Sequence, residues 1–159
     1  MTVKIRPMTQ ADKSSLMQIL HNTPEFKPSE VVVAEEIIDS YLFDPIKSGY
    51  YILVAESDST VAGYICYGTT PLTVGTWDLY WQAVAQEKRK QGLGSALTDA
   101  AEAEIRKAGG RLAFIETSST PEYESTRRYH LSHGYEIVAC ISDFYAPGDD
   151  KLIMQKRFT

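Results

Sequence analysis

The chain has 159 residues, of which 43% are hydrophobic and 23% are charged, and its formal net charge is −5. A chain of this length buries enough surface to fold as one domain without disulfide or metal staples, which excludes the small cross-linked scaffolds. The acidic balance argues against a nucleic-acid partner, because binding to a phosphate backbone depends on clustered Lys and Arg side chains.

Two cysteines, Cys66 and Cys140, each lie in an apolar run and have no CxxC spacing. This pattern predicts reduced core residues and a reducing compartment. The N-terminus lacks the apolar segment of a secretion signal, and no window of about 18 consecutive apolar residues is present. We therefore expect a cytoplasmic protein without membrane contact. His21 and His133 lack ligand spacing, so no metal site is predicted.

The N-terminal third has the pattern of one strand followed by two helices. Residues 3–6 alternate apolar and charged side chains, which is typical of a half-exposed strand. A helix follows, and a second helix begins at Ser29 or Glu30 and ends near Asp44. We expect each helix to bury one apolar stripe, formed by Leu16, Ile19 and Leu20 in the first and by Val33, Ile37 and Tyr41 in the second.

The rest of the chain alternates strands with helices. Residues 50–55 and 61–67 form two apolar runs around a turn, which predicts a hairpin of buried strands, and residues 77–85 predict a third strand. The later elements are expected to be a helix from Leu93 to a stop at Gly109, a parallel strand at 112–115, a helix from Thr120 to Gly134, and two strands, 136–141 and 151–156, around a loop at 145–150.

The turn between residues 84 and 95 carries the most information about function. It leads from a strand to a helix N-terminus, where unpaired N–H groups and the helix dipole favour an anion. Gly92 and Gly94 would let a phosphate approach closely, and three successive basic residues begin at Lys88. Neither the dinucleotide fingerprint nor the P-loop matches this spacing. From spacing alone, a solvated basic loop that caps the helix is an equal alternative.

The motif Arg89-x-x-Gly92-x-Gly94, placed between a strand and a helix, resembles the acetyl-CoA signature of the GNAT family of N-acetyltransferases. The likeness covers nearly the whole chain, and the segment from Tyr129 to Tyr135 resembles the aromatic end of the family's last helix. Residues 143–150 are similar to the branch that acetylates ribosomal-protein N-terminal alanine. The resemblance implies one α/β domain over residues 1–159, with about seven mostly antiparallel strands splayed in the middle and about four helices on both faces.

The resemblance also implies where acetyl-CoA binds. In the family, main-chain N–H groups of the signature turn hold the pyrophosphate, and the preceding strand pairs with the pantetheine. Tyr123 stands where relatives often carry an Asn near the cofactor, although core packing is the alternative. The implied cofactor-binding residues are Gln82, Ala83, Val84, Arg89, Lys90, Gln91, Gly92, Leu93, Gly94, Ser95 and Tyr123.

Three catalytic groups are expected from the chemistry of acetyl transfer to an amine. The attacking amine must lose a proton, and Glu116 matches a position that is often acidic in the family; a solvated strand-end charge is the alternative. The backbone N–H of Val84 is the expected oxyanion donor. His130 stands where the family has a Tyr that protonates the thiolate. It could act as an acid, hydrogen-bond the sulfur as a neutral ring, or have no catalytic role.

The acceptor side is the least determined. Asp78, Tyr80, Asp143 and Tyr145 could line an acceptor mouth, although each is also an ordinary strand-end residue. The sequence therefore predicts an acetyl-CoA-dependent N-acetyltransferase that acts on a primary amine by direct transfer in a ternary complex. A non-catalytic acyl-CoA-binding sensor and an adaptor domain are the alternatives. The acceptor's identity stays open, and a homodimer through the exposed final strands is also left open.

Overall fold

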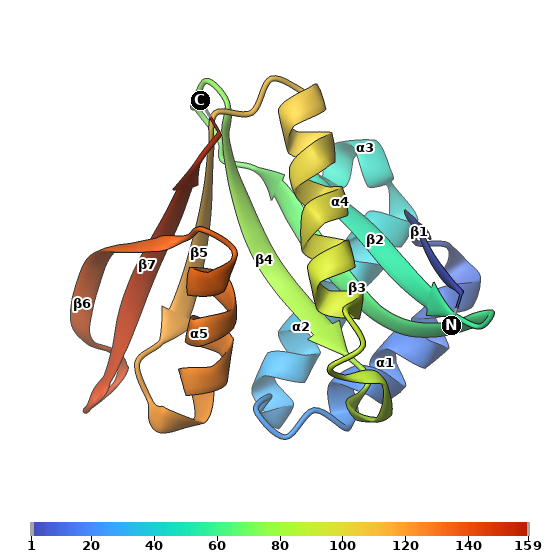
Figure 1. The fold of residues 1–159 in the computed structure, drawn as a ribbon, viewed down its shortest axis with the longest axis horizontal. Helices are drawn as coiled ribbons and strands as arrows, with labels where there is room; N and C mark the ends of the chain where they lie inside the picture. Colours follow the sequence, from blue (N-terminus) through green and yellow to red (C-terminus); the bar gives the residue numbers. More distant parts are fainter. Residues whose placement is uncertain (1, 159) are drawn as a thin grey trace.

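A computed structural model describes residues 2–158, so the predicted domain extends one residue beyond this range at each end. Over these residues the chain forms one seven-stranded sheet with the order β1-β2-β3-β4-β5-β7-β6 (Figure 1). Every neighbouring pair is antiparallel except β4 and β5, which are parallel. The strands are β1 (Val3–Pro7), β2 (Tyr50–Ser57), β3 (Thr60–Thr69), β4 (Thr76–Val84), β5 (Leu112–Ser118), β6 (Glu136–Ala146) and β7 (Asp149–Arg157).

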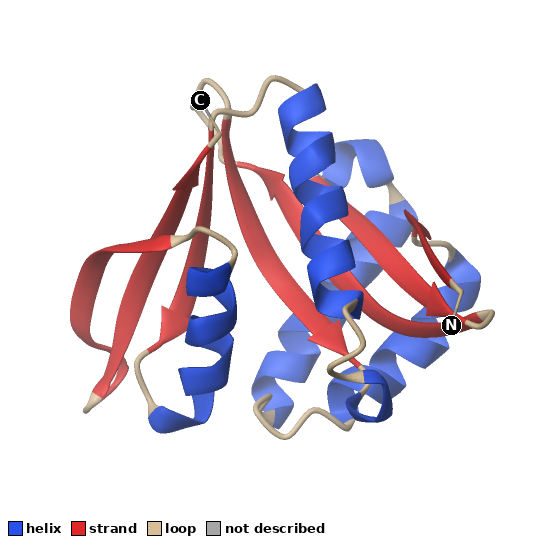
Figure 2. Cartoon of the chain, viewed as in Figure 1, coloured by secondary structure: helices blue, strands red, loops and turns tan. Residues whose placement is uncertain are grey.

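The helices of the described residues cover both faces of this sheet, which confirms the predicted α/β architecture. They are α1 (Lys13–His21), α2 (Pro28–Phe43), the one-turn α3 (Pro45–Ser48), α4 (Leu93–Lys107) and α5 (Glu124–Ser132), with 3-10 turns η1 (Gln10–Asp12), η2 (Gln86–Lys88) and η3 (Pro121–Tyr123). Figure 2 shows α4 and α5 in front of the sheet and α1 and α2 behind it. The short α3 and the three 3-10 turns were not predicted.

Two apolar cores pack the helices onto the sheet. On one face, α1 and α2 bury Leu16, Leu20 and Ile38 against β2 and β3. On the other, α4 places Leu97 and Ile105 against β3 and β4, as its helical spacing predicts. A smaller cluster under α5 contains buried side chains from β5, β7 and the segment that follows α5, namely Ala113, Ile115, Tyr135 and Met154. The sheet therefore has two halves, β1–β4 and β5–β7, whose clusters share the partly buried Leu79 and Phe158.

The two halves separate along the line between β4 and β5. These strands pair only from Thr76 to Asp78, opposite Leu112 to Phe114, and beyond that point they diverge (Figure 1). β3 has a register irregularity between Cys66 and Tyr67, opposite Trp81 and Leu79 of β4, which is where the divergence from β5 begins. The splay predicted for the middle of the sheet is therefore present, and it opens a gap toward the end of β4.

The buried stripe of α2 differs from the prediction. The helix buries Val31, Ala34 and Ile38, whereas Val33 is 46% exposed; Ile37 and Tyr41 are only partly buried. Residues 31–33 are three consecutive valines, so apolar spacing alone does not determine which face turns inward. Packing against the sheet decides it.

The C-terminal hairpin is also tighter than predicted. β6 runs to Ala146 and β7 begins at Asp149, so the expected six-residue loop is a two-residue turn. β6 is the last strand of the sheet, and all its residues are exposed. Cys140 is therefore exposed, and its predicted core position was wrong; Cys66 is buried as predicted. The expected homodimer through these strands stays a prediction.

Candidate active site

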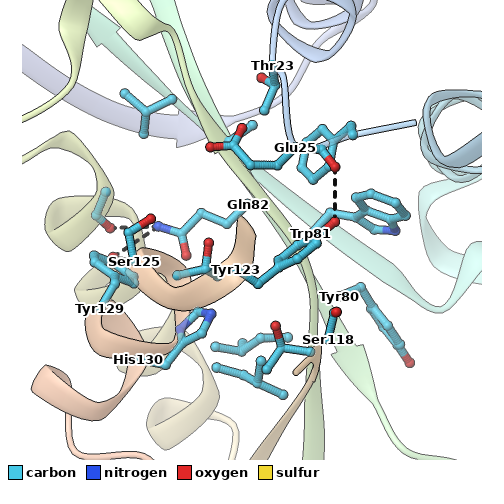
Figure 3. Close-up of a pocket in the computed structure, with 18 of the residues that line it drawn as sticks. Thr23, Glu25, Tyr80, Trp81, Gln82, Ser118, Tyr123, Ser125, Tyr129 and His130 are labelled. Carbon is cyan, nitrogen blue, oxygen red and sulfur yellow. Dashed lines mark hydrogen bonds between the residues drawn. The ribbon is translucent and has the colours of Figure 1, made fainter. Parts of the chain in front are cut away.

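A cleft of about 1140 Å³ occupies the gap between the two halves of the sheet. β4 and β5 form its floor, and the α1–α2 connection, the glycine turn and α5 contribute its walls. Figure 3 shows side chains of Glu25, Trp81, Gln82, Tyr123 and His130 facing this space from both halves. Residues that are far apart in the sequence therefore meet at one site.

The glycine turn forms one end of the cleft. Its backbone is left-handed at Lys90 (φ 62°) and at Gly92 (φ 82°), and α4 begins at the next residue. No side chain caps this helix N-terminus, so the first N–H groups of α4 are available to an anion. Lys88, Arg89 and Lys90 line the same end of the cleft, whereas Gln91, also expected at the cofactor, is not among its lining residues.

The two glycines of the turn have different structural roles. A Cβ on Gly92 would meet no atom within 4 Å, so the reason for a glycine at this position is its positive φ and not a lack of space. A Cβ on Gly94 would lie 3.3 Å from the hydroxyl of Tyr129 and 3.5 Å from Nε2 of Gln82. Gly94 therefore lets α4 approach α5 and β4 closely, a role in addition to the expected contact with phosphate.

A hydrogen-bond network joins the two halves beside this turn. Gln82 Nε2 donates to the Gly94 carbonyl at 2.9 Å and to the Tyr129 hydroxyl at 3.1 Å. That hydroxyl also lies 2.7 Å from Thr98 Oγ1. Burial raises the pKa of Tyr129, so its phenol remains protonated. Tyr129, the first residue of the segment that resembles the end of the family's last helix, thus reaches β4 through its hydroxyl and lines the cleft.

The main chain of β4 presents polar groups to the gap. Ala85 N donates to the Ala62 carbonyl of the β3 side at 2.8 Å. Because N–H directions alternate along a strand, the N–H groups of Gln82 and Val84 point away from β3, toward the gap. By the same alternation Ala83 faces β3, so its expected main-chain contact with the cofactor is not favoured by this geometry.

His130 lies on α5, half-buried in the cleft wall. Burial, together with repulsion from His133, lowers the pKa of His130 to about 4. The ring is therefore neutral at physiological pH, which favours the neutral-imidazole alternative over an imidazolium acid. His133 holds the neighbouring turn, because its Nε2 lies 3.1 Å from the hydroxyl of Ser95, a residue expected at the cofactor.

Glu116 and Tyr123 both line the cleft, and both have protein partners. Glu116 Oε2 forms an ion pair with Lys151 Nζ at 2.9 Å. The Tyr123 hydroxyl donates to the Glu25 carbonyl at 3.1 Å and also lies 3.4 Å from Glu30 Oε2, so η3 is joined to the α1–α2 connection and to α2 (Figure 3). The structure thus gives Tyr123 a bridging role that its predicted cofactor contact did not include.

Three of the four expected acceptor residues, Asp78, Tyr80 and Tyr145, line the cleft. Asp78 lies where β4 and β5 part. Asp143 is not among the lining residues: its carboxylate accepts from Gly148 N at 2.8 Å, and its own backbone is left-handed. We therefore assign Asp143 to the shape of the β6–β7 hairpin rather than to acceptor contact.

Residues of the α1–α2 connection and of the first turn of α2 were not predicted from the sequence. Glu25, Phe26 and Glu30 line the cleft, and Phe26 packs edge-on against Trp81 of β4 with ring centroids 5.4 Å apart. This segment has no motif of its own, and its place in the site depends on a fold contact across the sheet. No sequence signal could have identified it.

No helix within residues 2–158 has the length and apolar character that crossing a membrane requires. Among these same residues, His, Cys, Asp and Glu side chains form no group of three or more that could hold a metal ion.

Comparison with known proteins identifies relatives of the whole chain. Residues 15–135 match the model of the acetyltransferase (GNAT) family. A crystal structure of a Desulfovibrio desulfuricans protein assigned to the GNAT family of acetyltransferases is 38% identical, with 99% of this chain and 100% of that chain covered and a TM-score of 0.95. Among curated proteins, none matches the chain.

Two more distant structures share the fold. The ribosomal-protein-alanine N-acetyltransferase from Brucella melitensis is 23% identical over 98% of this chain and 99% of its own, with a TM-score of 0.75. An acetyltransferase-like protein from Salmonella typhimurium, determined with its cofactor acetyl-CoA, is 21% identical over 99% of this chain and 94% of its own, with a TM-score of 0.78.

Proposed function

This chain belongs to the acetyltransferase (GNAT) family, and we therefore propose that it transfers the acetyl group of acetyl-CoA to the nitrogen of a primary amine. One observation carries the proposal: the uncapped N-terminus of α4 and the gap-facing N–H of Val84 belong to the same cleft. An anion-binding turn next to an oxyanion donor is the arrangement that a CoA thioester requires.

The cleft residues fit the cofactor. The N–H groups at the start of α4, with Lys88 and Lys90 beside them, would hold the pyrophosphate. The left-handed Gly92 keeps those groups uncovered. Acetyl-CoA supplies an activated acyl carbon, and the N–H of Gln82 would help to orient the pantetheine along β4.

The chain's own groups then support direct transfer. The N–H of Val84 would donate to the thioester oxygen as it gains negative charge, an interaction worth about 3 to 4 kcal/mol of barrier. Glu116 would accept the amine proton through its oxygen that is not paired with Lys151, directly or through water. The neutral His130 would hydrogen-bond the sulfur, and water would supply the proton to the departing thiolate.

The test combines CoA release with cofactor binding. Acetyl-CoA should raise the melting temperature of the wild type, because a ligand at 100 times its dissociation constant adds about 2.7 kcal/mol. The variant Gly92→Val should lose this shift, since Val disfavours φ 82°. CoA should be released with one or more amines of a primary-amine panel.

The absence of a thermal shift with acetyl-CoA would refute the proposed cofactor site. A shift without CoA release on any amine would favour the second candidate, a non-catalytic acyl-CoA sensor. The observation that keeps this candidate open is His130, a neutral ring at the position where the family has a proton-donating Tyr.

A further inference from the structure

His133 connects the end of α5 to the first turn of α4. Its side chain is half-buried and packs against the ring of Tyr129, with ring centroids 4.2 Å apart. Nδ1 lies 2.8 Å from the main-chain carbonyl oxygen of Tyr129, and Nε2 lies 3.1 Å from Oγ of Ser95. Each ring nitrogen therefore has a partner within the protein. These partners differ, because a carbonyl oxygen only accepts hydrogen bonds, whereas a hydroxyl both donates and accepts.

The partners determine which nitrogen of the neutral ring carries the proton. Because the Tyr129 carbonyl oxygen can only accept, Nδ1 must be the donor in that contact. The Ser132 hydroxyl, 3.3 Å from Nδ1, already donates to the same carbonyl at 2.6 Å, so it too can only accept from Nδ1. The single proton of a neutral His133 is therefore on Nδ1. Its unprotonated Nε2 then accepts from the Ser95 hydroxyl, which directs its proton at the ring.

This direction of the Ser95 hydroxyl conflicts with the binding of a phosphate. Ser95 lies in the first turn of α4 and lines the cleft, where the pyrophosphate of the cofactor is expected. A phosphate oxygen accepts hydrogen bonds, so it needs the same hydroxyl proton that a neutral His133 holds. A second proton on the ring removes the conflict. Nε2–H then donates to Ser95 Oγ, and the hydroxyl is free to donate to the phosphate.

The ring is surrounded by groups from three elements that are compatible with a positive charge. The titratable ones are Tyr129 and His130 of α5, Asp99 and Glu102 of α4, and Lys156 of β7. Lys156 Nζ donates to the main-chain carbonyl of His133 at 2.7 Å, and Glu102, also 2.7 Å from Nζ, balances its charge. Burial lowers the pKa of His130 to about 4 and keeps that ring neutral. His133 itself is the C-cap of α5, where the helix dipole favours a cation.

We propose that His133 is a positioning residue for the cofactor: when the pyrophosphate binds, Nε2 of His133 takes up one proton from solvent and donates to Ser95 Oγ, and the Ser95 hydroxyl donates to the phosphate. This inference rests on the proposed function, which places acetyl-CoA in the cleft. His133 is not among the cleft-lining residues and acts through Ser95. No covalent bond of the cofactor changes. Because binding and protonation favour each other, the affinity for CoA must depend on pH.

The experiment measures the binding of dephospho-CoA by calorimetry at pH 6 and pH 8. This probe keeps the pyrophosphate and lacks the 3′-phosphate, whose own second ionisation falls near pH 6. Histidine is the side chain that ordinarily titrates in this interval, and His130 does not, because its pKa is about 4. We expect an affinity about fivefold higher at pH 6 than at pH 8. Titrations at pH 7 in buffers of different ionisation enthalpy should show net proton uptake on binding.

Two variants separate the ring from the hydroxyl. His133→Gln should bind the probe with an affinity that does not change between pH 6 and pH 8 and without proton uptake, because Gln does not titrate there. Ser95→Ala keeps the ring but removes the hydroxyl that links it to the phosphate, and it should lose most of the pH dependence as well. His21→Gln is the matched control, because His21 lies at the exposed end of α1 and does not line the cleft. It should retain the pH dependence of the wild type.

The outcomes distinguish the role of His133 from the cofactor site itself. Equal affinities of the wild type at pH 6 and pH 8, with no proton uptake, would overturn the inference and leave the acetyltransferase proposal standing. Proton uptake that persists in His133→Gln would also overturn the inference, because the proton would then go to another group. If neither dephospho-CoA nor acetyl-CoA binds at either pH, the proposed function itself fails.

Discussion

Replacing His130 by Gln should reduce the pH dependence of stability, because burial of this ring in the folded chain disfavours its protonated form. In the folded chain the pKa of His130 is lowered to about 4 from an ordinary value near 6.5. The unfolded chain therefore binds a proton at a higher pH than the folded chain does. It follows that the free energy of unfolding decreases as the pH falls from about 6.5 to about 4.

The magnitude follows from the two pKa values. Linkage predicts that His130 lowers the free energy of unfolding by about 2 kcal/mol between pH 7 and pH 5, and by about 3 kcal/mol in total once the pH is below about 4. Gln keeps a polar side chain of similar reach but does not titrate in this range.

The assay is urea unfolding of the wild type and His130→Gln at pH 7 and pH 5, followed by tryptophan fluorescence. The wild type should lose about 2 kcal/mol more than the variant between these two values. His21→Gln, at the exposed end of α1, serves as the matched control and should behave like the wild type. Equal losses in the wild type and His130→Gln would refute the conclusion that the ring is held neutral by burial.

Three further predictions concern stability and reactivity. Asp12→Asn should lower the free energy of unfolding by about 3 kcal/mol at pH 7, because Asp12 is 4% exposed and Arg6, 2.8 Å away, lowers its pKa. This difference between the wild type and the variant should disappear in acid, as the pH falls through the lowered pKa of Asp12. Urea unfolding of both proteins at pH 7 and in acid measures it. Gly94→Ala should weaken CoA binding measured by calorimetry, since its Cβ would press on the Tyr129 hydroxyl at 3.3 Å, and Tyr129→Phe should partly restore it. Iodoacetamide should label only Cys140 in the native protein, as intact mass with peptide mapping would show, whereas labelling of the buried cysteine would contradict the core assignment.

The parts of the site that are continuous in sequence were predictable. The glycine turn could be located from its motif because the strand, turn and helix that form it are adjacent in the chain. The position of His130 was likewise predictable, because it lies in the helix that ends before Gly134, and the φ of 91° at Gly134 is consistent with the predicted helix stop. The neutrality of the His130 ring was not predictable, because it depends on burial by other elements.

The sequence by itself determined the order and type of nearly all the strands and helices, because apolar periodicity and turn residues act locally. It could not determine which face of α2 turns inward, or that β6 is an exposed edge, because both depend on what packs alongside. Tertiary structure alone brought Tyr123 to Glu25, 98 positions apart. The gap between β4 and β5 sets which side chains share the cleft, and that separation is a property of the whole sheet.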